Sequence, residues 1–322
     1  MLAIFNVTAP FFALVLCGYL AARQRMLPEN AVPALNGFVL YFALPCMLFR
    51  FAAGAPLSQI ANGPVFFTYL ATGLITYGFV LFALRYGHGE SMRDSSLGAL
   101  SVAWSNWGYM GFALLPPMLG HQAGPLIIAA GMGDLLVIMS LALALGAVGD
   151  ATHGGPKAAL VAALRGMAKN PLIWAVLLGL VVSGSGAKLP QALDTFVSLL
   201  GTGAGPIALF TIGMSLYRAP QKDAVQSSML KRGDVLFLTA AKLVIHPYLL
   251  LVVAKLMNLP AQEMHVLVLM AALPTAGSVF LFATRHEADS ERISAVILLT
   301  TALTFVTFSL MLYVVGAIPP PL

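Results

Sequence analysis

The stretch 101–111 reads Ser-Val-Ala-Trp-Ser-Asn-Trp-Gly-Tyr-Met-Gly and lies inside a long apolar run. A second stretch, 271–278, reads Ala-Ala-Leu-Pro-Thr-Ala-Gly-Ser and lies inside another apolar run. Proline removes a backbone donor and clashes with the preceding helical turn, and glycine permits unwound backbone. Both stretches are therefore expected to interrupt a helix. Interrupted apolar segments at corresponding positions in two halves of a chain point to the substrate site of a secondary transporter.

The breaks offer a way to bind an anion. The helix segment that follows each break begins with free backbone N–H groups and a positive dipole end. Two breaks that cross at the middle of the membrane could therefore bind an anion without a charged side chain. The alternative is that Pro274 only kinks a helix and the glycines only permit close packing. The candidate substrate-binding residues are Asn106, Gly108, Pro274, Thr275, Gly277 and Ser278.

The composition places both stretches in a membrane protein. Of the 322 residues, 59% are apolar and 9% are charged, whereas a soluble domain has about 45–50% and about 25%. A helix that crosses the bilayer needs about 20 mostly apolar residues, and helices are the default because strands in lipid leave backbone groups unpaired. The expected fold is an all-α integral membrane protein with ten transmembrane helices. The ten runs are 3–22, 33–53, 64–84, 95–118, 124–148, 171–187, 195–217, 233–256, 263–284 and 293–316.

The basic residues predict the orientation. Of the 17 lysines and arginines, thirteen lie in the odd-numbered loops. The other side has Lys188, with Arg50 and Lys255 near helix ends. The positive-inside rule then makes the odd loops cytoplasmic and places both termini on the outer side of the membrane. The net charge of +5 is thus a topology signal and does not indicate a nucleic-acid partner.

The two halves show weak internal similarity. Pro10 and Gly18 match Pro171 and Gly179 with the same spacing. Because each half has five spans, an odd number, the second copy would be inserted upside down, as in many secondary transporters. The linker between the halves is either a plain basic connection or a short interfacial helix. The expected units are a first five-helix repeat, 1–150, a cytoplasmic linker, 151–170, and a second, inverted five-helix repeat, 171–322.

Three ionisable side chains lie inside expected spans. Asp134 is in the fifth span, and Lys242 and His246 are in the eighth. Charges in lipid are costly and are functional by default, so these residues are candidates for ion or proton coupling or for charge support. Asp134 could carry a proton and could pair with Lys242. The alternatives are a structural ion pair and, for His246, simple packing.

Catalytic chemistry finds little support. The sequence Gly-Met-Gly-Asp at 131–134 matches the intramembrane aspartyl proteases, but no second carboxylate lies in the middle of another span. Metalloprotease, serine-hydrolase and P-loop motifs are absent from the sequence, as are metal-ligand spacings. The sequence therefore predicts no enzyme, no cofactor and no metal. A channel, a membrane sensor or an exporter of an uncharged metabolite remains an alternative to an anion carrier.

Three segments carry a resemblance to a known family. They are Thr-Ala-Pro-Phe-Phe-Ala-Leu-Val-Leu-Cys-Gly-Tyr-Leu at 8–20, Leu-Asn-Gly-Phe-Val-Leu-Tyr-Phe-Ala-Leu-Pro at 35–45, and Ala-Ala-Leu-Pro-Thr-Ala-Gly-Ser-Val-Phe at 271–280. Over essentially its whole length the chain resembles the auxin efflux carrier family, which includes malonate-carrier-like bacterial permeases. The resemblance implies two inverted five-helix repeats, like those of sodium–bile-acid symporters, with helices 4 and 9 broken and crossing. It also implies a scaffold of helices 1, 2, 6 and 7, a transport domain that moves as an elevator, and often a homodimer.

By position, the resemblance assigns Asn106 to the asparagine beside the crossover and Pro274 to the crossover proline of the ninth helix. Lys242 matches a basic residue of the eighth helix, whose ammonium could take the place of the sodium ion of related folds. One departure is that the fourth span is interrupted at glycines, and its prolines, Pro116 and Pro117, come later. The resulting prediction is a secondary active or facilitative carrier of a small organic anion, such as a dicarboxylate or an auxin-like acid.

Overall fold

The computed structural model describes residues 2–28, 30–146, 171–218 and 233–317, together with 161, 165 and 168. Within this part of the chain the secondary structure is helical, apart from one isolated antiparallel bridge. The expected linker, 151–170, lies outside the described residues except for those three positions. The predicted all-α fold is confirmed for the described segments.

The helices are named α, and short π-helical turns are named η. The first half contains α1 (Leu2–Arg23), α2 (Ala31–Phe38), η1 (Val39–Ala43), α3 (Leu44–Gly54), α4 (Leu57–Ile60), α5 (Gly63–Phe82), η2 (Ala83–Gly87), α6 (Met92–Ala103), η3 (Trp107–Gly111), α7 (Phe112–Leu119), α8 (Ala123–Gly133), η4 (Asp134–Ile138) and α9 (Met139–Gly146). The second half contains α11 (Pro171–Ser185), α12 (Gln191–Arg218), α14 (Gly233–Ala240), η7 (Ala241–Ile245), α15 (His246–Leu256), α16 (Ala261–Ala271), α17 (Ser278–Arg285) and α18 (Ser290–Val315).

Six helical stretches of the described chain are long and apolar enough to cross a membrane. They are Ala31–Gly54, Leu57–Gly87, Ala123–Gly146, Gln191–Tyr217, Gly233–Leu256 and Ser290–Val315. Shorter apolar helices occupy Ala9–Arg23, Pro171–Ser185 and Ala261–Ala271. The expected fourth and ninth spans are each divided into two short helices, so neither forms one continuous span. Six spans are thus supported directly, and the ten-helix layout stays a prediction.

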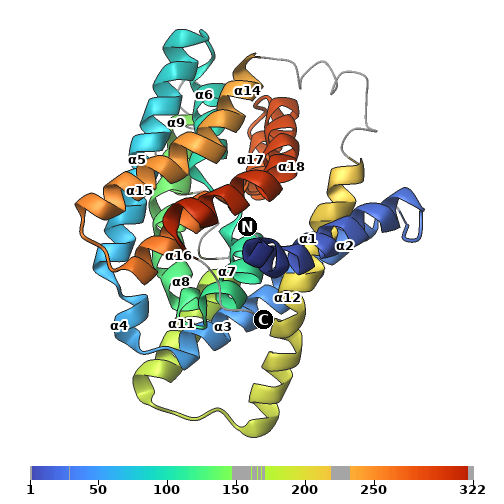
Figure 1. Cartoon of the computed structure of the whole chain (residues 1–322), viewed down its shortest axis with the longest axis vertical. Helices are drawn as coiled ribbons and strands as arrows, with labels where there is room; N and C mark the ends of the chain where they lie inside the picture. Colours follow the sequence, from blue (N-terminus) through green and yellow to red (C-terminus); the bar gives the residue numbers. More distant parts are fainter. Residues whose placement is uncertain are drawn as a thin grey trace.

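The helices pack in two groups. The scaffold group consists of α1, α2, α3, α11 and α12, and the crossover group consists of α5 to α9 and α14 to α18. Each group makes most of its contacts internally. Figure 1 shows α1, α2 and α12 together on one side of the molecule, and α5, α6, α9, α14 and α15 on the other. The described helices therefore form two packing groups, and their roles as a scaffold and a transport domain stay a prediction.

Glycines hold the scaffold group together at close range. A Cβ atom at Gly18 of α1 would overlap the backbone carbonyl of Phe210 on α12, and one at Gly213 of α12 would overlap the carbonyl of Val15 on α1. The two helices therefore touch backbone to backbone through a reciprocal pair of glycines. Helices in a membrane associate through such close contacts at small residues, because the hydrophobic effect does not drive apolar helices together in lipid.

The matched glycine of the second half has the corresponding role. A Cβ at Gly179 of α11 would come within 2.7 Å of the backbone oxygen of Phe49 on α3. Gly18 thus brings α1, the first helix of the first half, against α12 of the second half. Gly179 brings α11, the first helix of the second half, against α3 of the first half. Both glycines of the sequence match thus lie at close contacts between helices, and the duplication itself stays a prediction.

Gly18→Ala is expected to lower the melting temperature of the purified protein in detergent. The added methyl group overlaps backbone that cannot rotate away, and overpacking of this kind costs about 1–3 kcal/mol. The matched control is Gly78→Ala on α5, where a Cβ meets nothing within 4 Å. That control gains about 0.5–1 kcal/mol of helix propensity and should melt no lower than the wild type. Equal melting temperatures for the two variants would contradict the packing argument.

A buried arginine joins helix ends within the crossover group. The Arg292 side chain, at the start of α18, is 1% exposed. Its guanidinium pairs with the Glu90 carboxylate, donates to the Asp94 backbone oxygen at 2.7 Å, and lies 3.5 Å from a carboxylate oxygen of Asp234. Asp94 and Asp234 lie in the first turns of α6 and α14. Arg292 therefore fixes the end of α6 that lies opposite its break.

Candidate substrate site at the crossing of two interrupted helices

The two interrupted segments meet and pair with each other. The chain leaves helical geometry after α6 and again after α16. The backbone N–H of Asn106 donates to the carbonyl of Pro274 at 2.8 Å, and that of Ala276 donates to the carbonyl of Trp104 at 3.2 Å. An antiparallel bridge lies between these two hydrogen bonds. Because buried backbone groups need partners, each break satisfies the other, and the expected crossing of the two segments is observed.

Thr275 fixes the crossing from its buried side. It is 1% exposed, and its hydroxyl donates to the backbone oxygen of Ser101 at 2.6 Å. Its backbone N–H donates to the hydroxyl of Thr300 on α18 at 3.3 Å. The hydroxyl proton of Thr275 is therefore committed to the α6 segment, and only its lone pairs remain for a ligand. Pro274 contributes through the carbonyl oxygen that Asn106 bonds.

Asn106 has an unengaged carboxamide. Its backbone oxygen accepts from the N–H of Met110 at 2.9 Å, and this hydrogen bond forms at the start of η3. The Asn106 side chain does not cap that turn. Among the hydrogen bonds of the described residues, none involves this carboxamide, and 8% of the residue is exposed. An amide that offers both donors and an acceptor beside the crossing is suited to hold a polar ligand.

The start of α17 is open beside the crossing. Gly277 is exposed and Ser278 is partly exposed, and the first turn of α17 has no side-chain cap. A Cβ at Gly277 would meet nothing within 4 Å, and one at Gly108 would meet only the Leu44 side chain at 3.9 Å. The backbone N–H groups of Val279 and Phe280 donate to the carbonyls of Ala276 and Gly277 at 3.1 and 3.2 Å. What favours a negative charge here is therefore the positive dipole end of the helix.

A buried cation lies directly against the crossing. The ammonium of Lys242, in η7, donates to the hydroxyl of Ser105 at 2.6 Å and lies 3.2 Å from Nδ1 of His246. All three residues are fully buried. Ser105 is itself one of the two residues of the bridge between the breaks. The Tyr69 hydroxyl of α5 lies against Ser105 without a hydrogen bond of ordinary geometry. Lys242 therefore places its charge behind the paired backbone.

The buried carboxylate of Asp134 is linked to the fourth-span break. Its Oδ2 accepts from the indole N–H of Trp107 at 3.0 Å, and its Oδ1 has no hydrogen-bond partner among the described residues. The ion pairs of the described residues do not include Asp134 with Lys242. The direct ion pair expected as one alternative from the sequence is thus not formed, because Lys242 is engaged by Ser105 and Asp134 by Trp107.

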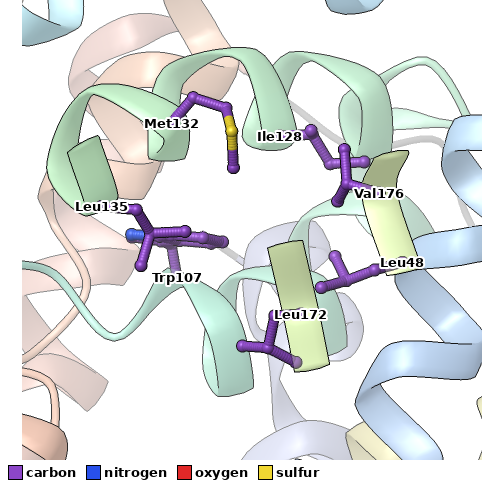
Figure 2. A pocket seen from close by; sticks show the side chains of 7 residues that line it. All are labelled: Leu48, Trp107, Ile128, Met132, Leu135, Leu172 and Val176. Carbon is purple, nitrogen blue, oxygen red and sulfur yellow. The ribbon is translucent and has the colours of Figure 1, made fainter. Parts of the chain in front are cut away.

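Two apolar cavities lie where the groups meet. The smaller, of about 10 Å³, is lined by Leu48, Trp107, Ile128, Met132, Leu135, Leu172 and Val176. In Figure 2, Met132 and Leu172 face each other across this space, and Trp107 and Leu135 close one end. A second cavity, of about 190 Å³, shares Met132 and Val176 and is lined by apolar residues of α4, α8 and α11. The contact between the groups is therefore apolar at these cavities.

Comparison with known proteins gives the chain its family. A family model described as membrane transport protein matches residues 3–148 and 156–312, which include both breaks and the buried charges. The chain belongs to the auxin efflux carrier family of membrane transport proteins. It is a transporter of the membrane, as its long apolar helices also indicate.

Relatives within this family carry transporter names. A Rhizobium meliloti protein provisionally named a malonate transporter is 28% identical over 327 residues, covering 100% of this chain and 99% of the relative. The uncharacterized transporter YfdV of Escherichia coli K12 is 25% identical over 307 residues, with 95% of each chain covered. Auxin efflux carrier component 8 of Arabidopsis thaliana is 24% identical over 347 residues, with 90% of this chain and 91% of the relative covered.

Three residues of the site were not predicted from the sequence. Ser105 and Trp107 lie within the stretch 101–111 but carry no separate signal there, and Tyr69 carries none in its span. Indole and phenol groups in an apolar span usually find a polar partner, which is the one clue that the sequence offers. Asp134, Lys242 and Trp107 each lie in a π-helical turn. Such turns are frequent at functional sites, and hydropathy does not reveal them.

Proposed function

We propose that this transporter carries a small organic anion by alternating access, with the anion bound at the crossing. The observation that carries the proposal is the free carboxamide of Asn106 at a crossing whose buried side is held by the Lys242 ammonium. We assign ligand contacts to Asn106, Gly277 and Ser278. Gly108 gives room, and Pro274 and Thr275 shape the crossing.

Electrostatics favours an anion at this site. The start of α17 lies beside the crossing, and the positive dipole end of a helix attracts negative charge. The cation of Lys242 adds to that potential from a fully buried position, where charges act more strongly than at the surface. The names of two relatives, a malonate transporter and an auxin efflux carrier, refer to organic acids. These observations support a carboxylate as the cargo, either a dicarboxylate or an auxin-like acid.

The division into two groups supports alternating access. We propose that the crossover group slides against the scaffold group as an elevator and carries the crossing with it. The apolar contact around Met132 and Val176 has few directional bonds to break during such a movement. The reciprocal glycine contacts of α1 with α12 and the Gly179 contact of α11 with α3 keep the scaffold group rigid. The inverted repeats at 1–150 and 171–322 are part of this proposal.

The buried charges form the proposed support for coupling. Asp134 and Lys242 lie within the crossover group and would travel with the substrate. We propose that Asp134 exchanges a proton during the cycle and that Lys242, held by Ser105 and His246, supplies a fixed cation where a sodium ion would otherwise be needed. A bacterial inner membrane location with both termini periplasmic, and a homodimer, complete the proposal. The thirteen basic residues of the odd loops support the orientation.

A thermal-shift screen tests the proposed cargo. Purified protein in detergent is heated with C3 to C6 mono- and dicarboxylates, with aromatic acids, and with the amide of each acid. A ligand at 100 times its Kd stabilises the folded state by about 2.7 kcal/mol, so at least one acid should raise the melting temperature while its amide does not. A shift by an uncharged metabolite, with none by any acid, would contradict the proposal.

A further inference from the structure

We infer that Trp107 is a positioning residue that links the buried carboxylate of Asp134 to the interrupted segment carrying Asn106. The inference rests on the proposed function, because the link affects transport only if the substrate binds beside Asn106. Trp107 directly follows Asn106, opens η3, and is 4% exposed. The backbone N–H that pairs with the Pro274 carbonyl thus belongs to the residue next to Trp107.

The polar edge of Trp107 is the hydrogen-bond partner of Asp134. Its Nε1–H donates to Oδ2 at 3.0 Å, and the other carboxylate oxygen has no hydrogen bond within the described part of the chain. The titratable groups that act on Asp134 from the neighbouring helices are Lys242 of η7 and Tyr69 of α5. A hydrogen bond to an ionised carboxylate is shorter and stronger than one to a neutral acid. The strength of this link therefore depends on whether Asp134 is charged.

The indole ring is held in one orientation by a glycine of α8. A Cβ atom at Gly131 would lie 2.6 to 2.7 Å from three ring carbons of Trp107, so only glycine admits the ring at this position. Gly131 and Asp134 are three residues apart along continuous helix and thus share one face. α8 and η4 therefore bind Trp107 twice, once through the ring and once through the N–H. The ring also packs against Phe112 at a centroid distance of 6.3 Å.

The far side of the ring faces the scaffold group. Trp107 lines the small cavity together with Leu48 of α3 and Leu172 of α11 (Figure 2). One side chain thus touches the buried acid, adjoins the substrate-site asparagine and forms part of the wall that faces the other group. A change in the charge of Asp134 is transmitted through this side chain to both the crossing and the contact between the groups.

The test compares Trp107→Phe with Asp134→Asn and with the double variant. Phenylalanine keeps an aromatic ring and removes the N–H. Exchange of labelled malonate or of an acid found in the thermal-shift screen is measured in proteoliposomes between pH 5.5 and pH 8. Loss of one charge-assisted hydrogen bond predicts a fall of about tenfold in maximal rate. The KM should change by less than about threefold, because the groups assigned to ligand contact are intact.

Two features separate this role from a merely structural one. The pH profile of Trp107→Phe should become as flat as that of Asp134→Asn, and the double variant should be no slower than the slower single variant. Trp174→Phe is the control, since it removes an indole N–H on α11 that bonds the Ala168 carbonyl and not Asp134, and it should keep the wild-type pH profile. The inference would be overturned if the loss of maximal rate in the double variant equalled the product of the two single losses. A wild-type pH profile in Trp107→Phe would also overturn it.

A second measurement does not depend on transport. In the variant Trp104→Phe/Trp174→Phe, the protein keeps only Trp107 of its three tryptophans, so its fluorescence reports on this indole. The emission should change with pH, and adding Asp134→Asn should abolish that change. Constant emission in the parent variant would overturn the link even if transport is normal. A pH-dependent emission in a protein that exchanges no organic acid would support the link and refute the proposed cargo.

Discussion

Asn106→Ala is expected to abolish exchange of the organic anion while the protein remains folded and in the membrane. The alanine variant keeps the backbone N–H that bonds the Pro274 carbonyl, so the crossing itself is retained. It loses the carboxamide, which has no partner among the described residues and is free to bind a ligand. Hydrogen bonds to charged groups contribute about 1.5–3 kcal/mol, which corresponds to a loss of about ten- to a hundredfold for each bond.

The Asn106 prediction has two matched comparisons. Asn106→Asp keeps the shape of the side chain but places a negative charge at the anion site, and it should be as inactive as the alanine variant. Asn36→Ala makes the same truncation at an exposed position of α2 in the scaffold group and should exchange normally. Melting temperatures and membrane yield establish that all three variants fold. Normal exchange by Asn106→Ala would contradict the assignment of the substrate site to the crossing.

Lys242→Met is expected to lower the melting temperature of the protein, and by more than Asn106→Ala does. Methionine retains the apolar stem but removes the ammonium that bonds Ser105 and lies against His246. The hydroxyl, the imidazole and the nearby carboxylate of Asp134 then remain buried without it. Leaving a buried polar group without its hydrogen-bond partner costs about 1–3 kcal/mol. The measurement is the melting temperature in detergent, with the Gly78→Ala protein as a reference for an ordinary substitution.

The double variant Asp134→Asn/Lys242→Met tests whether the two charges depend on each other. They make no direct ion pair in the structure, so the coupling should be partial. Neighbouring groups in one network show interaction energies of about 0.5–3 kcal/mol. The double variant should therefore be more stable than the sum of the single losses predicts, but still unable to exchange the anion. Strictly additive losses would mean that Asp134 and Lys242 act independently and would refute a shared coupling role.

The sequence predicted the helical class, both breaks and their crossing, because proline, glycine and small polar residues are conspicuous within apolar runs. The partners of Asp134 and Lys242 were not predictable in the same way. Trp107 is 27 residues from Asp134, and Ser105 is 137 residues from Lys242. Helical spacing relates residues three or four apart and carries no information about such pairs. The expected Asp134–Lys242 pair was reasonable from charge alone, but each residue has a nearer partner.

The count of spans shows a second limit of hydropathy. An interrupted span such as 95–118 reads as one apolar run, whereas the structure divides it at residues 104–106 into helices too short to cross alone. The glycines show the opposite case. Gly18 and Gly179 form only a weak match in the sequence, yet both lie where two helices touch backbone to backbone. The weak match therefore coincides with a steric requirement that the sequence alone does not reveal.

Counterflow in proteoliposomes tests the central claim most directly. Vesicles with purified protein are loaded with unlabelled malonate, or with an acid found in the thermal-shift screen, and the uptake of the same labelled acid is followed. An alternating-access carrier predicts saturable uptake that is accelerated by the internal acid and is absent with Asn106→Ala. Uptake that does not saturate, is indifferent to the internal acid and is unchanged by Asn106→Ala would contradict the account and indicate a channel.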